Sequence, residues 1–281
     1  MSTAPIGSAE SPGVPPPARI TAPSLFRRKG EDPESRIVCL TAYDFSTAAL
    51  LDAADCIDLL LVGDSLGCIV QGHETTLPVT LDEMVYHSRC VARGTQRALV
   101  VGDLPFMSYQ VSPEQALGAA GRLVKEGGVA AVKLEGGVAM AKTIVRIVSA
   151  GIPVMGHVGL TPQSFHALGG HVRQGKSAAA RARILEDAQA VSEAGAFALV
   201  LECIPEELAL EITRTVKCPT IGIGSGAVCD GEILVTHDLV GLRPGKPPPF
   251  VRQEAQLGEL IIDATRRFAR RVTEPAVSRV N

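Results

Sequence analysis

Charged and polar side chains recur directly after short apolar runs of the sequence, at the point where each run ends. They are Asp44, Asp64, Asp103, Lys133, Glu135, His157 and Glu202. A single acidic residue after a strand is usually a helix cap or a loop residue. Such residues after six successive runs indicate more, because the carboxyl ends of parallel strands in a barrel meet at one end, where active sites are built. The pattern therefore predicts a catalytic site at that end.

Three of these side chains are carboxylates that could share a metal ion. Asp64, Asp103 and Glu135 follow neighbouring runs, and carboxylate oxygens suit Mg²⁺, which keeps several waters and needs few protein ligands. The six histidines show no HxxxH or HxH spacing, so a zinc site dominated by imidazole is not supported. The sequence thus favours magnesium.

Other residues of the set have two interpretations each. Lys133 and Glu135 are two positions apart on one strand and share a face. Lys133 is expected to bind a carboxylate or enolate oxygen, which is compatible with an ion pair to one of the acids. His157 either orients the substrate or is a hydrogen-bonded structural histidine. Ser65, next to Asp64, either binds a substrate carboxylate or caps a helix.

Glu202 is the candidate general base. It follows the apolar run Ala198–Leu201, where loss of solvent makes a carboxylate a stronger base toward a carbon acid. The alternative is that it caps the helix expected to begin near Pro205.

The elements that must position these residues alternate between apolar strands and amphipathic helices. The strands lack a polar alternation, as expected of parallel strands covered on both faces. They are predicted at 37–42, 58–62, 97–101, 130–134, 152–155, 197–201, 220–223 and 233–235. Capping boxes at 80–83 and 112–115 mark two helix starts. A chain of 281 residues with this pattern predicts an α/β protein, a (β/α)8 TIM barrel.

An open doubly wound sheet would show the same alternation, and the segment 222–226 superficially resembles a dinucleotide turn. It lacks the full GxGxxG spacing and follows the seventh strand rather than the first. In a barrel, such a turn is expected to line the site or approach a ligand anion. The segment 159–176, rich in Gly and His, is expected to be a lid or binding loop.

A single catalytic domain is predicted over residues 20–272, with its last helix at 259–271. Residues 1–19 have neither the basic nor the apolar region of a signal peptide and predict a disordered tail. Residues 273–281 are expected to form a frayed end.

Composition disfavours several classes of partner. A net charge of −3 and a pI near 6.1 disfavour nucleic acid and anionic membranes, which need clustered Lys and Arg. No apolar run approaches the roughly 20 residues that span a bilayer. The seven cysteines contain no CxxC pair, which is typical of reduced thiols in a cytoplasmic protein. Small molecules are the expected partners.

Eight collinear segments resemble the ketopantoate hydroxymethyltransferase family, also called 3-methyl-2-oxobutanoate hydroxymethyltransferases. The resemblance runs from about Ile20 to Phe250. The segments are LTAYDFS (40–46), LLVGDSLG (60–67), QGHETTLPVT (71–80), GDLPFMSY (102–109), VKLEGG (132–137), GHVGLTPQS (156–164), LVLECIP (199–205) and IGIGSG (221–226).

The resemblance implies a barrel of the phosphoenolpyruvate/pyruvate type and a specific reaction. In the first committed step of pantothenate synthesis, 5,10-methylenetetrahydrofolate, 3-methyl-2-oxobutanoate and water give 2-dehydropantoate and tetrahydrofolate. Chelation of the oxo acid by Mg²⁺ would stabilise the enolate. A large homo-oligomer, such as a decamer, is also implied.

The resemblance also assigns roles to residues of this chain by motif. Asp64 and Asp103 correspond to Mg²⁺ ligands, and Glu135 to a third metal-site residue that acts directly or through water. The 2-oxo acid site corresponds to Asp64, Ser65, Asp103 and Lys133. Glu202 corresponds to the base that removes the C3 proton.

The chain departs from the family pattern in two places. The residue after the paired glycines is His171 instead of an aromatic, and the following run reads RQGK (173–176). The end from Thr273 onward lacks the family's Pro-x-x-Glu-His tail. Two other functions remain open: another Mg²⁺-dependent 2-oxo acid lyase or mutase of the same barrel type, and a non-catalytic barrel that binds a small ligand.

Overall fold

Eight parallel strands close into a barrel in the computed structural model, which describes residues 18–30 and 35–274. Neighbouring strands follow chain order, and β8 returns to pair with β1, so that Ile37 lies opposite Gly231. The strands are β1 (Ile37–Thr41), β2 (Leu59–Val62), β3 (Leu99–Asp103), β4 (Ala131–Lys133), β5 (Val154–Gly159), β6 (Ala198–Glu202), β7 (Thr220–Ile223) and β8 (Gly231–Leu234). The predicted TIM barrel is confirmed, and the open doubly wound sheet is excluded.

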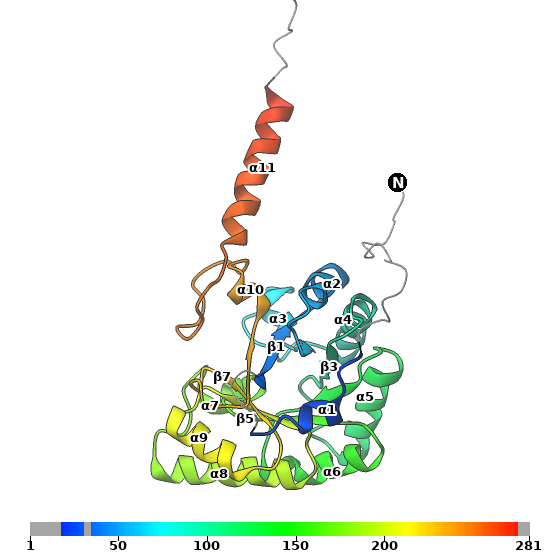
Figure 1. Ribbon diagram of the computed structural model, residues 1–281, viewed down its shortest axis with the longest axis vertical. Helices are drawn as coiled ribbons and strands as arrows, with labels where there is room; N and C mark the ends of the chain where they lie inside the picture. Colours follow the sequence, from blue (N-terminus) through cyan, green and yellow to red (C-terminus); the bar gives the residue numbers. More distant parts are fainter. Residues whose placement is uncertain (1–17, 31–34, 275–281) are drawn as a thin grey trace, which may run out of the picture.

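Helices follow the first six strands and form the outer layer (Figure 1). These helices are α2 (Phe45–Ala53), α4 (Leu81–Gly94), α5 (Pro113–Lys125), α6 (Ala141–Ser149), α8 (Ala178–Glu193) and α9 (Glu206–Thr215). Shorter helical segments lie at the strand ends: α3 (Leu66–Ile69), η2 (Val138–Met140), η3 (Pro162–Ser164), α7 (Phe165–Leu168) and α10 (Thr236–Leu239). The described segment 224–230, which joins β7 to β8, contains no helix.

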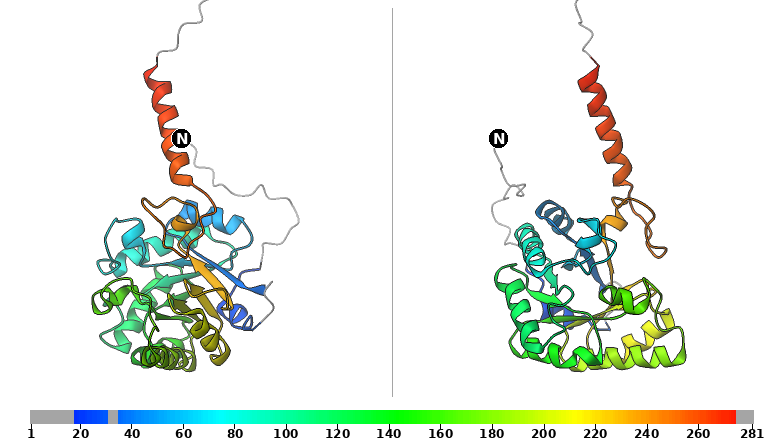
Figure 2. Two further views of the ribbon diagram at one scale, coloured as in Figure 1. Left: turned by 90° about the vertical axis from the view of Figure 1, so that its left-hand side faces the viewer. Right: turned by 180° about the vertical axis from the view of Figure 1, so that it is seen from behind.

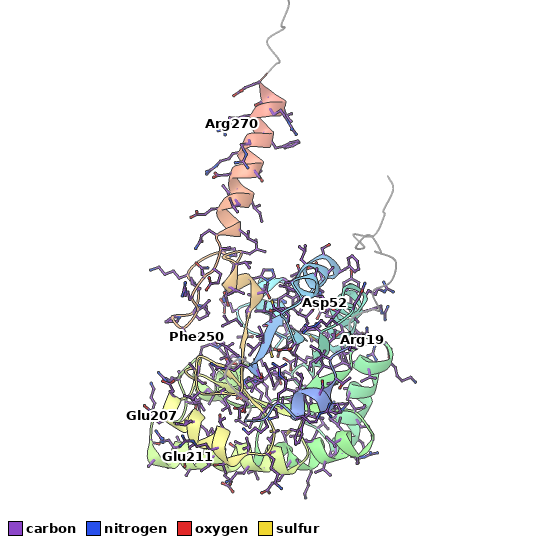
Figure 3. The ribbon with its side chains drawn as sticks, viewed as in Figure 1. Arg19, Asp52, Glu207, Glu211, Phe250 and Arg270 are labelled. Atoms are coloured by element: carbon purple, nitrogen blue, oxygen red, sulfur yellow. The ribbon has the colours of Figure 1, made fainter. Side chains whose placement is uncertain are left out.

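The start of β3 is set by a side chain of α2. The carboxylate of Asp52 accepts the backbone N–H groups of Arg97 and Ala98, at 3.0 and 2.8 Å. The sequence predicted a strand that begins at Arg97, and in the structure the strand begins at Leu99. Asp52 lies on the side of the barrel where Arg19 also approaches (Figure 3).

Three strands reach further than predicted at their carboxyl ends, and β6 does so by one residue, to Glu202. β3 runs on to Asp103, and β5 occupies Val154–Gly159 instead of 152–155. Asp103 and His157 therefore lie inside regular strands, whose pairing with neighbouring strands fixes their backbone. Residues in paired strands offer a more rigid platform for a site than residues in loops.

The two predicted capping boxes differ in the structure. At Thr80 both reciprocal hydrogen bonds to Glu83 form, and they begin α4 as predicted. At the start of α5, Ser112 accepts the N–H of Gln115, but the side chain of Gln115 accepts from Val111 instead of from Ser112. The second site is therefore a simple N-cap rather than a capping box.

The barrel has separate apolar layers inside and outside the strands. Inward-facing residues alternate along each strand, as Leu59 and Leu61 do in β2, and form one cluster. The opposite faces pack on the helices as a second, larger cluster. The short helix α1 (Ala22–Phe26) closes the amino-terminal end, where Ala22 and Leu25 join the interior cluster.

The last helix, α11 (Leu257–Thr273), extends away from the barrel (Figures 1 and 2). It confirms the helix predicted at 259–271 and is two residues longer at each end. None of its residues is buried, and Arg270 lies far from the strands (Figure 3). Within the described part of the chain, no helix has the length and apolarity needed to cross a membrane.

The two predicted tails fall largely outside the described residues, which leave out 1–17 and 275–281. At the amino-terminal side, Arg19 Nε donates to the carbonyl of Gln96 at 3.2 Å. At the carboxyl side, Thr273 is the last residue of α11.

Asp230 connects the segment after α1 to the seventh and eighth strands. Its carboxylate accepts the backbone N–H groups of Thr220 at 2.7 Å and Gly30 at 2.9 Å, and the ammonium of Lys29 at 2.9 Å. Burial raises the pKa of Asp230, but the hydrogen bonds from Thr220, Lys29 and Gly30 outweigh burial and hold the pKa below its usual value. The charged form is therefore the one that stabilises the fold.

Replacement of Asp230 with Asn is expected to lower the free energy of unfolding by about 2 kcal/mol at neutral pH, because hydrogen bonds to a charged group contribute about 1.5–3 kcal/mol. A carboxyl with a depressed folded pKa contributes stability above its unfolded pKa, near 3.9, and loses it as pH falls through the folded pKa. Urea unfolding curves of wild type and D230N should converge below about pH 4. Asp263→Asn, on exposed α11, is the control. A stability difference that does not change with pH would contradict this account.

Candidate active site

The alternation that fills the barrel with apolar side chains continues into the charged residues at its carboxyl end. In β3 the inward positions Leu99 and Val101 are followed by Asp103. In β4 the inward Ala131 is followed by Lys133. The same step of two residues brings the remaining charged side chains to the barrel mouth, namely Glu135, His157 and Glu202.

These side chains line one cavity of about 130 Å³ at the mouth. Asp64 and Ser65, after β2, complete its polar side. Its apolar wall includes Leu61, Val200 and Ile233. The cavity therefore offers charged groups beside a surface for hydrocarbon.

A buried ion pair joins β3 to β4. The ammonium of Lys133 lies 2.9 and 2.8 Å from the two carboxylate oxygens of Asp103, and 4.0 Å from Glu135 Oε1. Burial disfavours the charged lysine, but the carboxylates of Asp103, Glu135 and Asp64 outweigh burial and raise the pKa of Lys133 above its usual value. Because Lys133 donates to both oxygens of Asp103, we assign the pair as ammonium and carboxylate.

The acidic side chains outnumber the lysine. Burial, with the charges of Asp103 and Glu135 beside it, raises the pKa of Asp64 well above its usual value. Asp64 is 3% exposed, so solvent compensates little of this repulsion. The mouth therefore holds several buried carboxyl groups whose ionised forms repel one another, and a bound cation would relieve that repulsion.

His157 lies between two carboxylates. Its Nδ1 is 3.4 Å from Glu135 Oε1, and its Nε2 is 3.1 Å from Glu202 Oε2. Neither contact has the alignment of a hydrogen bond, so the attraction is electrostatic. Burial and Lys133 lower the pKa of His157, but the two carboxylates raise it to about 9. His157 thus bridges the acidic cluster and the candidate base.

The helix-cap alternatives for Ser65 and Glu202 are wrong. The hydroxyl of Ser65 makes no cap hydrogen bond to α3 and lies 2.8 Å from the hydroxyl of buried Tyr43. At the start of α9, no side chain caps the helix, so Glu202 is not its cap. Glu202 stays partly exposed, with 17% of its side chain accessible, and faces the cavity.

Asp44 does not belong to the site, although it follows β1. Its carboxylate accepts the N–H of Thr47 at 2.9 Å and caps α2, and its side chain is exposed. Asp44 is therefore a helix cap, which is the usual role of an acidic residue after a strand.

The Gly-rich turn after β7 also has an internal partner. A side chain at Gly226 would meet the carboxyl group of Glu206, whose Oε1 accepts the N–H of Ala227 at 3.1 Å. A carboxylate of the protein therefore occupies the space beside Gly226. Ile223, at the start of the turn, does line the cavity.

The donor set at the mouth fits Mg²⁺ with additional ligands. In the described ranges, no group of three or more Asp, Glu, His or Cys side chains is arranged to hold a metal ion. Asp103 faces Lys133, and Asp64 Oδ2 accepts from Gln163 at 2.9 Å. Oxygen ligands suit an ion that takes one or two carboxylates and completes its shell with water or substrate oxygens. Of the predicted ligands, Asp64 and Asp103 fit this description, and Glu135 lines the same cavity as a third residue that would act directly or through water.

Sequence reasoning missed three residues that hold the site together: Gln163, Tyr109 and Tyr43. Each lies within a segment that carries the family resemblance, but its spacing to the charged residues gave no sign of a contact. The predicted loop at 159–176 contains η3 and α7, and Gln163 lies in η3.

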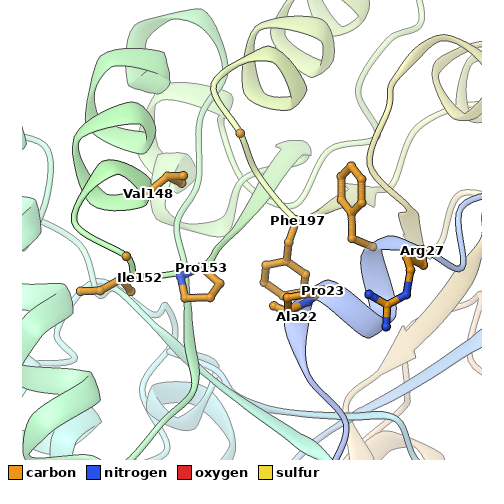
Figure 4. A pocket seen from close by; sticks show the side chains of 10 residues that line it. Ala22, Pro23, Arg27, Val148, Ile152, Pro153 and Phe197 are labelled. Carbon is orange, nitrogen blue, oxygen red and sulfur yellow. The ribbon is translucent and has the colours of Figure 1, made fainter.

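A second cavity, of about 440 Å³, lies at the opposite end of the barrel (Figure 4). It is lined by α1 and by the segments before β5 and β6, including Ile152, Pro153 and Phe197 (Figure 4). Arg27 is its only charged lining residue among those described. The clustered carboxylates therefore single out the carboxyl end as the site of chemistry.

Known structures share this architecture. A phosphoenolpyruvate phosphomutase from Streptomyces platensis subsp. rosaceus aligns over 90% of this chain and 88% of its own, with a TM-score of 0.61 and 14% identity. A 2,3-dimethylmalate lyase aligns over 94% and 91%, with a TM-score of 0.61 and 18% identity. Phosphonopyruvate hydrolase in complex with oxalate and Mg²⁺ has a TM-score of 0.59 and 12% identity over 93% and 90%. These likenesses show that the chain shares the closed (β/α)8-barrel fold of these proteins, of which the 2,3-dimethylmalate lyase is a member of the phosphoenolpyruvate mutase/isocitrate lyase superfamily.

Sequence comparison narrows this class to one family. Residues 19–277 match the family model for ketopantoate hydroxymethyltransferase. The 3-methyl-2-oxobutanoate hydroxymethyltransferase of Carboxydothermus hydrogenoformans is 50% identical over 91% of this chain and 92% of its own. The one from Magnetococcus marinus is 55% identical over 84% and 87%. The chain belongs to the ketopantoate hydroxymethyltransferase family, and the resemblance predicted from its motifs is confirmed.

Removal of the lysine from the buried pair should destabilise the fold. Lys133→Met is expected to lower the free energy of unfolding of the metal-free protein by about 3 kcal/mol, because removal of one partner of a buried ion pair leaves the other charge uncompensated. The exposed Lys142→Met is the control and should change stability by less than about 0.5 kcal/mol. Denaturant unfolding at constant pH measures both. Equal stability of K133M and wild type would rule out the ion pair as a structural element.

Proposed function

We propose that the protein transfers a hydroxymethyl group from 5,10-methylenetetrahydrofolate to 3-methyl-2-oxobutanoate, giving 2-dehydropantoate and tetrahydrofolate in pantothenate biosynthesis. One observation carries the proposal: in a member of this family, Lys133, Glu202 and the acidic cluster face a single cavity at the barrel mouth. The reaction needs a group that holds an oxo acid and a base at its C3 carbon, and this arrangement supplies both.

The cavity suits the two halves of a branched 2-oxo acid. Lys133 and Ser65 offer donors to its carboxylate and keto oxygens. Val200, Ile223 and Ile233 offer an apolar wall to its isopropyl group. Asp64 and Asp103 would belong to the same substrate site through the ion that they would hold.

Asp64 and Asp103, with Glu135 directly or through water, are the residues that would hold one Mg²⁺ in each subunit. When bound, the ion supplies a Lewis acid that polarises the keto oxygen and stabilises negative charge developing on it. The surplus of buried carboxylates supports this role, since a cation offsets their mutual repulsion.

Side chains of the protein carry out the proton transfer and stabilise the enolate. Glu202 takes the proton from C3, and His157, 3.1 Å from Glu202 Oε2, orients that carboxylate. The ammonium of Lys133 counters the charge that develops on the enolate oxygen. C3 then forms a bond to the methylene carbon of the folate while one of that carbon's two C–N bonds breaks, and the freed nitrogen takes up the proton removed from C3. Cleavage of the second C–N bond and addition of water give the hydroxymethyl group, and the other proton of the water goes to the departing tetrahydrofolate.

Homo-oligomerisation, for which the family resemblance implies an assembly such as a decamer, and a cytoplasmic location stay predictions. The exposed apolar residues of α11, among them Leu260, Ile261 and Phe268, support association with another copy. A 17-residue helix that buries no side chain gains little stability from its own hydrogen bonds in water.

The direct test is proton NMR of 3-methyl-2-oxobutanoate with the protein, Mg²⁺ and 5,10-methylenetetrahydrofolate in D₂O. We expect loss of the C3 proton signal and growth of a hydroxymethyl signal, both abolished by EDTA and restored by Mg²⁺. Exchange without product, or turnover that does not need folate, would favour another Mg²⁺-dependent 2-oxo acid lyase or mutase. Neither signal in the presence of a tightly bound ligand would favour a binding protein.

Glu202→Gln tests the base. The variant should fold normally and lose about 10²–10⁴-fold in kcat, because general base catalysis contributes about that much. C3 proton exchange should fall in parallel. Glu211→Gln, on the exposed side of α9, is the matched control and should retain wild-type rates. Normal turnover by E202Q would exclude Glu202 as the base.

A further inference from the structure

Gln163, in η3 after β5, is buried beneath the acidic cluster and has no role in the proposed reaction. It is 5% exposed and is not among the residues that line the cavity. Its side-chain nitrogen donates to Asp64 Oδ2 and to the carbonyl of Leu104, both at 2.9 Å. Its side-chain oxygen accepts from the hydroxyl of Tyr109 at 2.7 Å and from Gln110 Nε2 at 3.1 Å.

These contacts fix the orientation of the amide. A glutamine side chain has two N–H donors and two acceptor positions, and all four are used here. Rotation of the amide by 180° would set its oxygen against the carboxylate of Asp64 and the carbonyl of Leu104. The donor toward Asp64 is therefore held in place by the partners on the other side of the amide.

The backbone of the same residue holds a second carboxylate. The N–H of Gln163 donates to Glu135 Oε2 at 3.0 Å. The hydroxyl of Tyr109, which donates to Gln163, also accepts the N–H of Glu135 at 3.1 Å. One residue of the segment after β5 thus contacts the chain just after β2, β3 and β4.

We infer that Gln163 is a positioning residue that holds Asp64 and Glu135 at the separation needed to bind one divalent cation. The inference rests on the proposed Mg²⁺ site. Asp64 is repelled by Asp103 and Glu135 and has little solvent to compensate, so it needs a donor to stay beside them. Through Gln163, the geometry of this pair depends on the segment after β5.

Loss of the hydrogen bond from Gln163 to Asp64 should lower the affinity of the protein for the cation. Loss of an outer hydrogen-bond partner of a metal ligand typically weakens metal binding or activity by about 10–100-fold. Gln163→Met keeps the length of the side chain and removes all four hydrogen bonds. Gln163→Asn keeps an amide that is too short to reach both Asp64 and Tyr109, and it carries the test if the Met variant does not fold.

The test is calorimetric titration of Mg²⁺ alone into the full-length, metal-free protein. Gln163→Met should raise the Kd for Mg²⁺ by about 10–100-fold, and Gln163→Asn by less. Gln110→Met is the matched control, because it removes one partner of the same amide and leaves the contact with Asp64. Its Kd should stay within about threefold of wild type.

Steady-state kinetics over a range of Mg²⁺ concentrations give a second readout. A positioning role predicts that high Mg²⁺ restores most of the kcat of Gln163→Met, whereas a general packing defect would not respond to the ion. Wild-type Mg²⁺ affinity in the folded variants, or an equal loss in Gln110→Met, would overturn the role of Gln163. Failure of the wild-type protein to bind Mg²⁺ would instead overturn the metal site itself, and this inference with it.

Discussion

Burial of several carboxylates at one end of the barrel is the constraint on which the rest of the site depends. Asp64, Asp103 and Glu135 are each no more than 5% exposed, and one ammonium, that of Lys133, lies among them. Buried charges need partners, because the low dielectric strengthens repulsion as much as attraction. The hydrogen bonds from Gln163, the N–H of Asp64 that Asp103 accepts, and the contact with His157 add further compensation. A divalent cation is the chemical group that would complete it.

The same strands provide both the stable core and this costly cluster. Along β3, Leu99 and Val101 fill the interior, and Asp103 follows them at the next inward position. The apolar layer between strands and helices is larger than the interior cluster, and its packing offsets what the polar mouth costs. The packed barrel below the site thus stabilises strands that place like charges close together.

Much of this architecture could be predicted from the sequence, because alternation along a strand is a local property. The barrel and the charged residues that face the cavity followed from it, whereas the bounds of several strands did not. The contacts that fix them did not: Gln163 and Asp64 are 99 positions apart, and Asp52 sets the start of β3 from 46 positions away. Asp44 shows a second limit of the sequence. An acidic residue after a strand gives the same sequence pattern whether it caps a helix or lines the site.

In the proposed reaction, the position of His157 accounts for how Glu202 could act as a base beside several acids. An ionised Glu202 would be repelled by the acidic cluster, and the imidazole between Glu202 and Glu135 reduces that repulsion. The side chain of Glu202 is also the more accessible of the two, with 17% exposed against 3% for Glu135. The inner carboxylates are therefore suited to hold a cation, and the outer one to exchange a proton with a substrate that enters from the barrel mouth.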